Sequence, residues 1–277
     1  MLLLVNHETV FEYSDEILNS IMEVRLRPLT DARQAVRTSV LEVSPRVRLF
    51  PYHDYFGNAT DFFTVTRRHR RLAVVSRSLV ETASARQATW EPALGPETAA
   101  LSEYLQFEGP VCRHPEVDAI ARRFAGEPDL PSRLSLVAHW IHEEFEYKPQ
   151  ATAVDSTVAD VLTLRSGVCQ DFAHLMIGIC REMGLPARYV SGYIFTNRAA
   201  GVRGHDASHA WCQVYVPGHG WLGFDPTNDL TVDERYVEVA IGRDYRDVAP
   251  TKGLYRGSAS ERMTVSVHTE LERSAGA

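Results

Sequence analysis

The stretch LRSGVCQDFAHLMIGICREMGLPARYVSGY, from Leu164 to Tyr193, is the part of the sequence that decides the fold. Its apolar residues recur at helical spacing and predict a helix from Cys169 to Met183. Gly184 is expected to end this helix, and a buried strand follows. Gly167 is expected to let the chain turn sharply into the helix through backbone angles that other residues avoid.

Cys169 is therefore expected in the first turn of a helix. Unpaired backbone N–H groups and the positive end of the helix dipole meet there, and both favour a thiolate over a thiol. A lone cysteine near a helix is more often a small buried hydrophobic residue. Cys180 and Cys212 fit that description, since one lies on an apolar helix face and the other inside a strand. The case for Cys169 as a nucleophile depends on residues further along the chain.

A second stretch, DASHAWCQVYVPGHGWLGFDPTND from Asp206 to Asp229, predicts a β-hairpin. His209 opens its first strand and Asp225 closes its second, 16 positions later (225 − 209). An odd-length loop or a bulge would place the two side chains on one face of the hairpin, because an even separation keeps parity. A tight two-residue turn would instead pair Asp225 with Cys212. The register of this hairpin is therefore a test of the site.

Cysteine, histidine and aspartate together are the arrangement of a thiol acyl-transfer enzyme. His209 would hold the Cys169 thiolate as an ion pair and later protonate a leaving amine, while Asp225 would orient the ring. The backbone N–H of Cys169 could donate to the oxyanion of the tetrahedral intermediate. A second donor could be the Gln170 amide, the Tyr147 hydroxyl or another backbone N–H.

The composition is that of a globular chain: 277 residues, 44% apolar and 23% charged, with a net charge of −7. No window approaches the roughly 18 apolar residues of a membrane span, and no secretory leader is expected at Met1–Val5. The basic run Arg67–Arg71 is interpreted as a solvated hairpin tip and not as a nucleic-acid site. Four cysteines at irregular spacing suggest free thiols in a reducing, cytoplasmic setting.

Four parts of the chain are expected from the change in pattern. Residues 1–90 alternate polar and apolar residues between turns, which favours a β-sandwich domain. Residues 91–110 are a linker rich in proline and glycine at its start. Residues 111–267 begin with helical patterns and form a catalytic core, and residues 268–277 are a polar tail.

The two quoted stretches, in this order and at this spacing, resemble the core of the bacterial transglutaminase-like superfamily. The first ninety residues, with HDYFGNATDFF, resemble the β-rich domain that accompanies this core in bacterial members. The resemblance implies an α+β fold: an N-terminal β-sandwich followed by a papain-like core, in which a nucleophile helix packs on an antiparallel sheet. It also implies that the family's catalytic residues correspond to Cys169, His209 and Asp225.

The sequence departs from some relatives at other positions. Papain-type proteases have a glutamine six residues before the cysteine, where this chain has Thr163. Animal cross-linking enzymes carry calcium sites, and no acidic loop here resembles one, so neither a metal nor another cofactor is expected. His205 and Asp206 precede the histidine strand and could either line the cleft or serve the loop. His139 and His142, one turn apart, are interpreted as a packed or solvated face because a third metal ligand is missing.

The expected function is acyl transfer from an amide through a thioester on Cys169, most simply with water as the acceptor. That would make the chain a cysteine protease or amidase, acting on a peptide or protein and able to form a homo-oligomer. One alternative is transfer to an amine, which would make it a transglutaminase. Another is a binding or assembly module that keeps the fold without the chemistry.

Overall fold

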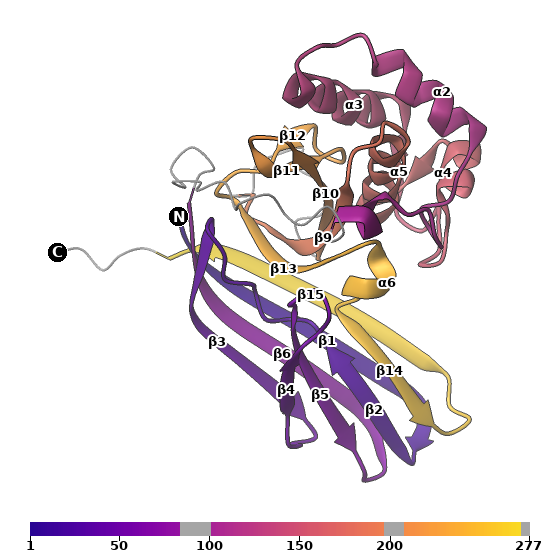
Figure 1. The fold of residues 1–277 in the computed structure, drawn as a ribbon. Helices are drawn as coiled ribbons and strands as arrows, with labels where there is room; N and C mark the ends of the chain where they lie inside the picture. The colour runs from indigo at the N-terminus through magenta and orange to yellow at the C-terminus, as the bar shows by residue number, and fades with distance from the viewer. Residues whose placement is uncertain (84–100, 197–207, 273–277) are drawn as a thin grey trace, which may run out of the picture.

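The N-terminal part of the protein is built from two four-stranded antiparallel sheets (Figure 1). The computed structural model describes residues 1–83, 101–196 and 208–272. One sheet has the strand order β15-β1-β6-β3 and the other has the order β14-β2-β5-β4. The strands of both sheets are β1 (Leu2–Ile17), β2 (Asn19–Val24), β3 (Gln34–Ser44), β4 (Phe50–His53), β5 (Ala59–Val65), β6 (His69–Thr82), β14 (Thr251–Arg256) and β15 (Glu261–Leu271).

Alternating side chains explain why these two sheets pack on each other. In β1, every second residue from Leu3 to Tyr13 is buried, so one face of the strand points inward. Phe11 of the first sheet and Phe63 of the second belong to one buried apolar cluster shared by both sheets. The predicted sandwich is therefore confirmed. The basic run at Arg67–Arg71, however, lies where the chain passes from β5 in one sheet to β6 in the other, so it is not a hairpin tip.

The C-terminal strands belong to the N-terminal sheets. Strand β14 pairs with β2, and β15 pairs with β1 from Leu3↔Leu271 to Tyr13↔Glu261. The sequence-based boundaries differ here, because they placed residues up to 267 in the core and residues 268–277 in a tail. The physical reason is that an alternating strand carries no local signal of which distant sheet edge it will pair with. Residues 84–100, which include the first half of the predicted linker, lie outside the described residues, as do residues 273–277.

The core combines a five-stranded antiparallel sheet, in the order β12-β11-β10-β9-β13, with helices on one side (Figure 1). A two-stranded parallel sheet joins β7 and β8. The helical elements are η1 (Glu103–Leu105), α2 (Pro115–Phe124), α3 (Leu130–Glu144), α4 (Val158–Leu164), α5 (Cys169–Glu182) and α6 (Tyr245–Val248). The strands are β7 (Glu146–Tyr147), β8 (Ser166–Gly167), β9 (Ala187–Ile194), β10 (His209–Val216), β11 (Gly220–Asp225), β12 (Leu230–Thr231) and β13 (Tyr236–Gly242).

Local signals set the helix boundaries. Helix α2 is capped by His114, whose Nδ1 accepts the N–H of Glu116 at 3.2 Å, and Pro115 occupies the first position. Helix α3 is capped by Asp129, whose carboxylate accepts the N–H of Ser132 at 3.0 Å. The predicted helix at Cys169 is confirmed as α5, which ends one residue before Met183.

Helix α5 is the centre of the core. It packs on β9 and β10 on one side and on α2, α3 and α4 on the other. All residues from Asp171 to Arg181 are buried, so the helix is enclosed on every side. Its N-terminal end, with Cys169, remains half-buried. Within the described ranges, no helix is long and apolar enough to cross a membrane.

The pairing of β15 with β1 leads to a stability prediction. Val267 is 4% exposed and packs with Leu3 and Val5, whereas Met263, in the same strand, is 53% exposed. We expect Val267→Ala to lower the free energy of unfolding by about 2 kcal/mol and Met263→Ala to change it by less than about 0.5 kcal/mol. Urea unfolding of both variants measures this. Equal effects would contradict the placement of the C-terminal strand in the N-terminal core.

Candidate active site

Gly167 allows close packing at the start of α5, for a different reason from the one predicted. Its φ angle does not lie in the left-handed region. Instead, a Cβ at this position would lie 2.8 Å from the Cβ and Oδ2 of Asp171. That carboxylate caps the helix by accepting the N–H of Val168 at 2.8 Å, and it also accepts the Thr152 hydroxyl at 2.6 Å. Glycine is needed here because the cap occupies the space of a side chain.

Cys169 is the first residue of α5 and carries a free, half-buried thiol. The positive end of a helix stabilises a thiolate at this position. The other partly exposed cysteine is Cys112, whereas Cys180 and Cys212 are fully buried. The two buried cysteines are therefore packing residues, as their positions in the sequence predict.

The β10–β11 hairpin has the odd-length loop that the site requires. Val216 pairs with Gly220 across a three-residue loop, and Cys212 pairs with Phe224. Continued by one residue, this register sets Asp225 beside Trp211, two residues from His209 and on the same face. His209 and Asp225 are thus diagonal neighbours and not a directly opposed pair. Because parity is kept, the distance between them stays short.

His209 and Asp225 form a fully buried pair. Nε2 of His209 lies 2.7 Å from Oδ2 of Asp225, and both side chains are 0% exposed. Burial alone would lower the pKa of His209, but Asp225 and Cys169 together raise it to about 10. Burial likewise opposes ionisation of Asp225, yet His209 and the hydroxyl and amide donors around that carboxylate hold its pKa below the ordinary value.

Cys169 completes the group from the helix side. Its thiol lies close enough to His209 to be one of the causes of that histidine's raised pKa. Nε2 of the ring is used by Asp225, and Nδ1 is buried and has no hydrogen-bond partner among residues 1–83, 101–196 and 208–272. The ring is therefore held with one nitrogen on the carboxylate and the other free for the thiol. α5, β10 and β11 each supply one of the three side chains.

Two further side chains contact Asp225, and the sequence analysis missed both. Oδ2 of Asp225 accepts the amide of Asn228 at 2.8 Å and the hydroxyl of Tyr236 at 2.9 Å. Oδ1 accepts the backbone N–H groups of Thr227 and Asn228 at 3.0 and 3.3 Å. An aspartate followed by turn residues is a local signal for the backbone bonds. Tyr236 gives no such signal, because it lies on another strand.

The oxyanion candidates differ in their surroundings. The side-chain amide of Gln170 donates to the carbonyl of Val154 at 2.9 Å, which directs it to the neighbouring loop and away from the thiol. Tyr147 is half-buried in β7, paired with Gly167, and its ring contacts Phe172 edge-on at 6.3 Å. The residue that pairs with Tyr147, Gly167, is two positions before Cys169. His205 and Asp206 lie outside the described residues.

His139 and His142 support the loop after Asp225. Nδ1 of His139 lies 2.7 Å from Oδ2 of Asp229, and Nδ1 of His142 lies 2.9 Å from the carbonyl oxygen of Thr227. The hydrogen bond to Asp229 raises the pKa of His139. Both rings are occupied by this loop, and the exposed His139 with the half-buried His142 agrees with the interpretation as a packed or solvated face. In the part of the chain that the structure describes, no three His, Cys, Asp or Glu residues gather as a metal site.

Two tryptophans of the hairpin and one histidine of α5 pack against neighbouring elements. Trp211 is fully buried, whereas Trp221 is half-buried beside Tyr104 at the turn end of the hairpin. His174 is buried in α5, and its Nε2 accepts the N–H of Tyr245 in α6 at 3.1 Å. Burial lowers the pKa of this histidine to about 3.

The core and the N-terminal part of this chain each match a known protein family. Residues 118–226 match the transglutaminase-like superfamily, and residues 3–81 match the bacterial transglutaminase-like N-terminal region. The first match includes α5, β10 and β11, with all three side chains of the group. The second ends at β6, so β14 and β15 lie beyond both matches.

Whole-length relatives are known in mycobacteria. The chain is 36% identical to an uncharacterized protein of Mycobacterium leprae over 95% of this chain and 96% of that protein. It is 33% identical to the protein-glutamine gamma-glutamyltransferase of Pseudomonas aeruginosa, over 68% of this chain and 30% of that protein. Among solved structures, a proposed cysteine protease from Cytophaga hutchinsonii has a TM-score of 0.78 at 23% identity, covering 99% of this chain and 92% of that chain. This last likeness shows the fold.

The charge on Asp225 has a measurable consequence for Cys169. Asp225→Asn keeps the shape of the side chain and removes the charge that stabilises the His209 imidazolium. We expect iodoacetamide to alkylate Cys169 at least about tenfold more slowly in this variant at neutral pH. Cys112 serves as the control inside the same molecule, because it is equally half-buried and its rate should not change. Peptide mass spectrometry measures both rates, and an unchanged rate at Cys169 would contradict the arrangement.

The pH dependence of His209 follows from its raised pKa. The folded value of about 10 exceeds the ordinary 6.5. The stability that this proton contributes is therefore fully present below pH 6.5 and is lost as pH rises through about 10. We expect the NMR signals of the His209 ring to titrate near pH 10 in the wild type and below 6.5 in Asp225→Asn. A wild-type midpoint at the ordinary value would be inconsistent with the buried ion pair.

Proposed function

Because the chain belongs to the transglutaminase-like superfamily and carries a bacterial transglutaminase-like N-terminal region, we propose that it is a cysteine-dependent acyl-transfer enzyme acting on amides. The observation that carries the proposal is the position of His209. Its ring is held by Asp225 at 2.7 Å, and the Cys169 thiol helps to raise its pKa. A thiolate beside an imidazolium is the resting state of a thiol nucleophile.

The reaction begins with attack of the Cys169 thiolate on the carbonyl carbon of an amide. The developing oxyanion accepts the backbone N–H of Cys169, at the positive end of α5. The imidazolium of His209 then gives its proton to the leaving nitrogen, the C–N bond breaks, and a thioester remains on Cys169. Asp225 keeps the ring oriented throughout and stays ionised.

The second half of the reaction releases the acyl group. Neutral His209 removes a proton from the acceptor, whose oxygen or nitrogen bonds to the thioester carbon. The C–S bond breaks, the thiolate is restored, and the ring is again protonated. With water as the acceptor the product is a carboxylic acid, and with a primary amine it is a new amide.

We propose hydrolysis of a peptide or protein amide as the main outcome. Water is the acceptor by default unless a site excludes it in favour of an amine. Amine transfer is the second candidate, favoured by the 33% identity to a protein-glutamine gamma-glutamyltransferase over 68% of this chain. A role as a binding module is less well supported, because all three side chains of the group are present, Asp225 binds His209, and Cys169 helps to raise the pKa of that histidine.

A single mass-spectrometric experiment separates these outcomes. The protein is incubated with a peptide library and a primary amine, and the masses of protein and peptides are then recorded. We expect a thioester on wild-type Cys169 and hydrolysed peptides, with little peptide–amine adduct. Cys169→Ala should abolish both products, whereas Cys112→Ala should change neither.

The competing results are distinct. A predominance of peptide–amine adducts would replace hydrolysis by amine transfer. Turnover that persists in Cys169→Ala would contradict the nucleophile. Complete absence of a thioester and of both products under reducing conditions would contradict the enzymatic proposal as a whole.

A further inference from the structure

Tyr236 contacts the candidate site from an unexpected direction. The other groups on the Asp225 carboxylate belong to the β10–β11 hairpin or to the residues just after it. Tyr236 lies on β13, which β9 and β10 separate from β11 in the strand order. Its hydroxyl nevertheless donates to Oδ2 of Asp225 at 2.9 Å, and both residues are buried. The sheet must therefore curl so that its edge strand faces the hairpin.

A glycine in β9 makes this curl compatible with the packing around Tyr236. Gly192 pairs with His209 on one side and with Glu238 on the other. A Cβ at Gly192 would lie 2.1 Å from the carbonyl oxygen of Val237 and 2.5 Å from the Trp211 ring. The missing side chain leaves room for Trp211, which contacts the Tyr236 ring at 5.2 Å.

The N-terminal sheets hold β13 close to this contact. The Gln34 side chain donates to the carbonyl of Glu238 at 2.7 Å and accepts its N–H at 2.8 Å, so it takes the place of a neighbouring strand. Arg33 forms an ion pair with the Glu238 carboxylate. The Thr82 hydroxyl donates to the carbonyl of Glu234 at 2.5 Å, on the other side of Tyr236.

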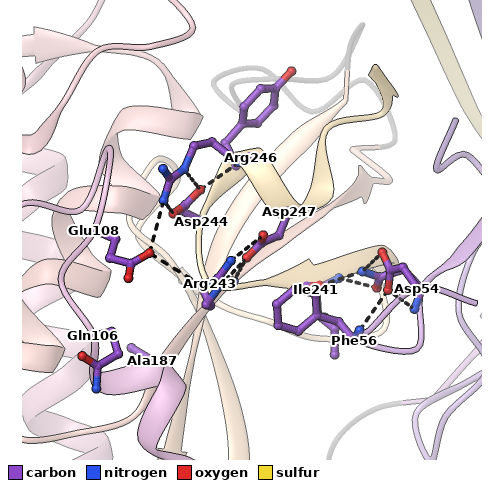
Figure 2. Close-up of polar contacts among 12 residues, drawn as sticks. Asp54, Phe56, Gln106, Glu108, Ala187, Ile241, Arg243, Asp244, Arg246 and Asp247 are labelled. Atoms are coloured by element: carbon purple, nitrogen blue, oxygen red, sulfur yellow. Dashed lines mark hydrogen bonds and ion pairs between the residues drawn. The ribbon is translucent and has the colours of Figure 1, made fainter. Parts of the chain in front are cut away.

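A second side-chain amide makes the same pair of hydrogen bonds at the far end of β13. Each such pair, at Gln34 and at Asn58, is called a clamp below. Asn58 donates to the carbonyl of Ile241 at 2.8 Å and accepts its N–H at 2.8 Å, in the turn that also carries Asp54 (Figure 2). Between the two clamps, the register of β13 shifts from Glu238 to Ala240. Gln34 thus acts two residues from Tyr236, whereas Asn58 acts beyond the irregularity. Only the first clamp is placed to affect the hydroxyl.

We propose that Tyr236 is a positioning residue for the acyl-transfer site and that the N-terminal β-domain, through Gln34 and β13, keeps its hydroxyl on Asp225. This inference rests on the proposed function. It gives the N-terminal domain a part in the chemistry as a support for the carboxylate that orients His209. A carboxylate that loses one donor is less firmly oriented and more easily protonated.

Tyr236→Phe tests the first part, because it keeps the buried ring and removes the hydroxyl. We expect alkylation of Cys169 by iodoacetamide to slow about fivefold relative to Cys112. Tyr193→Phe is the matched control, since it also removes a buried hydroxyl, one that bonds to Nδ1 of His7 at 3.0 Å in the contact with the N-terminal sheet. That variant should leave the ratio unchanged.

The pH dependence of Cys169 alkylation in the acidic range distinguishes a positioning role of the Tyr236 hydroxyl from a role in packing alone. The charged groups around this contact are Asp225, His209 with Cys169 behind it, and Arg235 and Asp233 next to Tyr236. The Tyr236 hydroxyl is one of the groups that lower the pKa of Asp225, so its loss should raise that pKa. The loss of Cys169 reactivity on acidification should therefore begin at a higher pH in Tyr236→Phe than in the wild type or in Tyr193→Phe.

A pair of amide variants tests the contribution of the N-terminal domain. Gln34→Leu and Asn58→Leu each remove a two-bond clamp on β13, and urea unfolding reports the stability that each loses. We expect only Gln34→Leu to slow the alkylation of Cys169. Adding Gln34→Leu to Tyr236→Phe should slow it no further than Tyr236→Phe alone. Additive effects, or equal effects of the two leucine variants on Cys169, would overturn the coupling through β13.

The alkylation rates in the wild type distinguish a failure of this inference from a failure of the proposed function. If wild-type Cys169 reacts no faster than Cys112, the proposed nucleophile itself is wrong. If wild-type Cys169 is fast and Tyr236→Phe matches it in both rate and pH profile, the function stands and the positioning role is overturned.

Discussion

The buried hydrogen bond between His209 and Asp225 is the interaction on which the rest of the site depends. Both side chains are fully removed from solvent, and burying a charged pair costs several kcal/mol unless good geometry and further hydrogen bonds compensate. The compensation comes from several directions: backbone N–H groups after Asp225, the Asn228 amide and the Tyr236 hydroxyl. His139 and His142 in α3 hold the same loop from outside. Much of the architecture around the sheet therefore serves one carboxylate.

The thiol is treated differently from this pair. Cys169 is half-buried at the start of a helix that is otherwise enclosed, and Asp171 rather than Cys169 provides the cap. Because the third residue provides the cap, the side chain of the first is not needed for capping and stays partly exposed. The His209–Asp225 pair is thus shielded from water, while the Cys169 thiol remains partly exposed. This division suits a reaction in which only the sulfur must reach an external carbonyl.

The two halves of the chain are joined more closely than their order in the sequence suggests. The chain begins in the sandwich, passes through the core and returns to the sandwich with β14 and β15. Strand β13 is the last core strand before that return, and side chains from the sandwich bind its backbone at Glu238 and Ile241 and the carbonyl of Glu234 just before it. Leu3, Val5 and Val267 of the sandwich also pack with Val237 and Val239 of this strand. The β-domain is consequently part of the frame of the core.

Much of this could be predicted from the sequence because the signals are local. The helix beginning at Cys169 and the hairpin opened by His209 both depend on neighbours close in the sequence. The residue types in these elements also indicated which three side chains to consider. Parity along two adjacent strands, with a loop of odd length, was enough to expect His209 and Asp225 on one face.

Other features were decided only by the tertiary structure. Tyr236 meets Asp225 because the whole sheet curls, and no short stretch of sequence encodes that curvature. Gly167 is required by the position of the Asp171 carboxylate and not by its own backbone angles. The partner of β15 is an edge more than two hundred residues away along the chain, as the pairing of Tyr13 with Glu261 shows. Local propensity determines which segments become strands and helices, but contacts between distant segments depend on how their faces pack together.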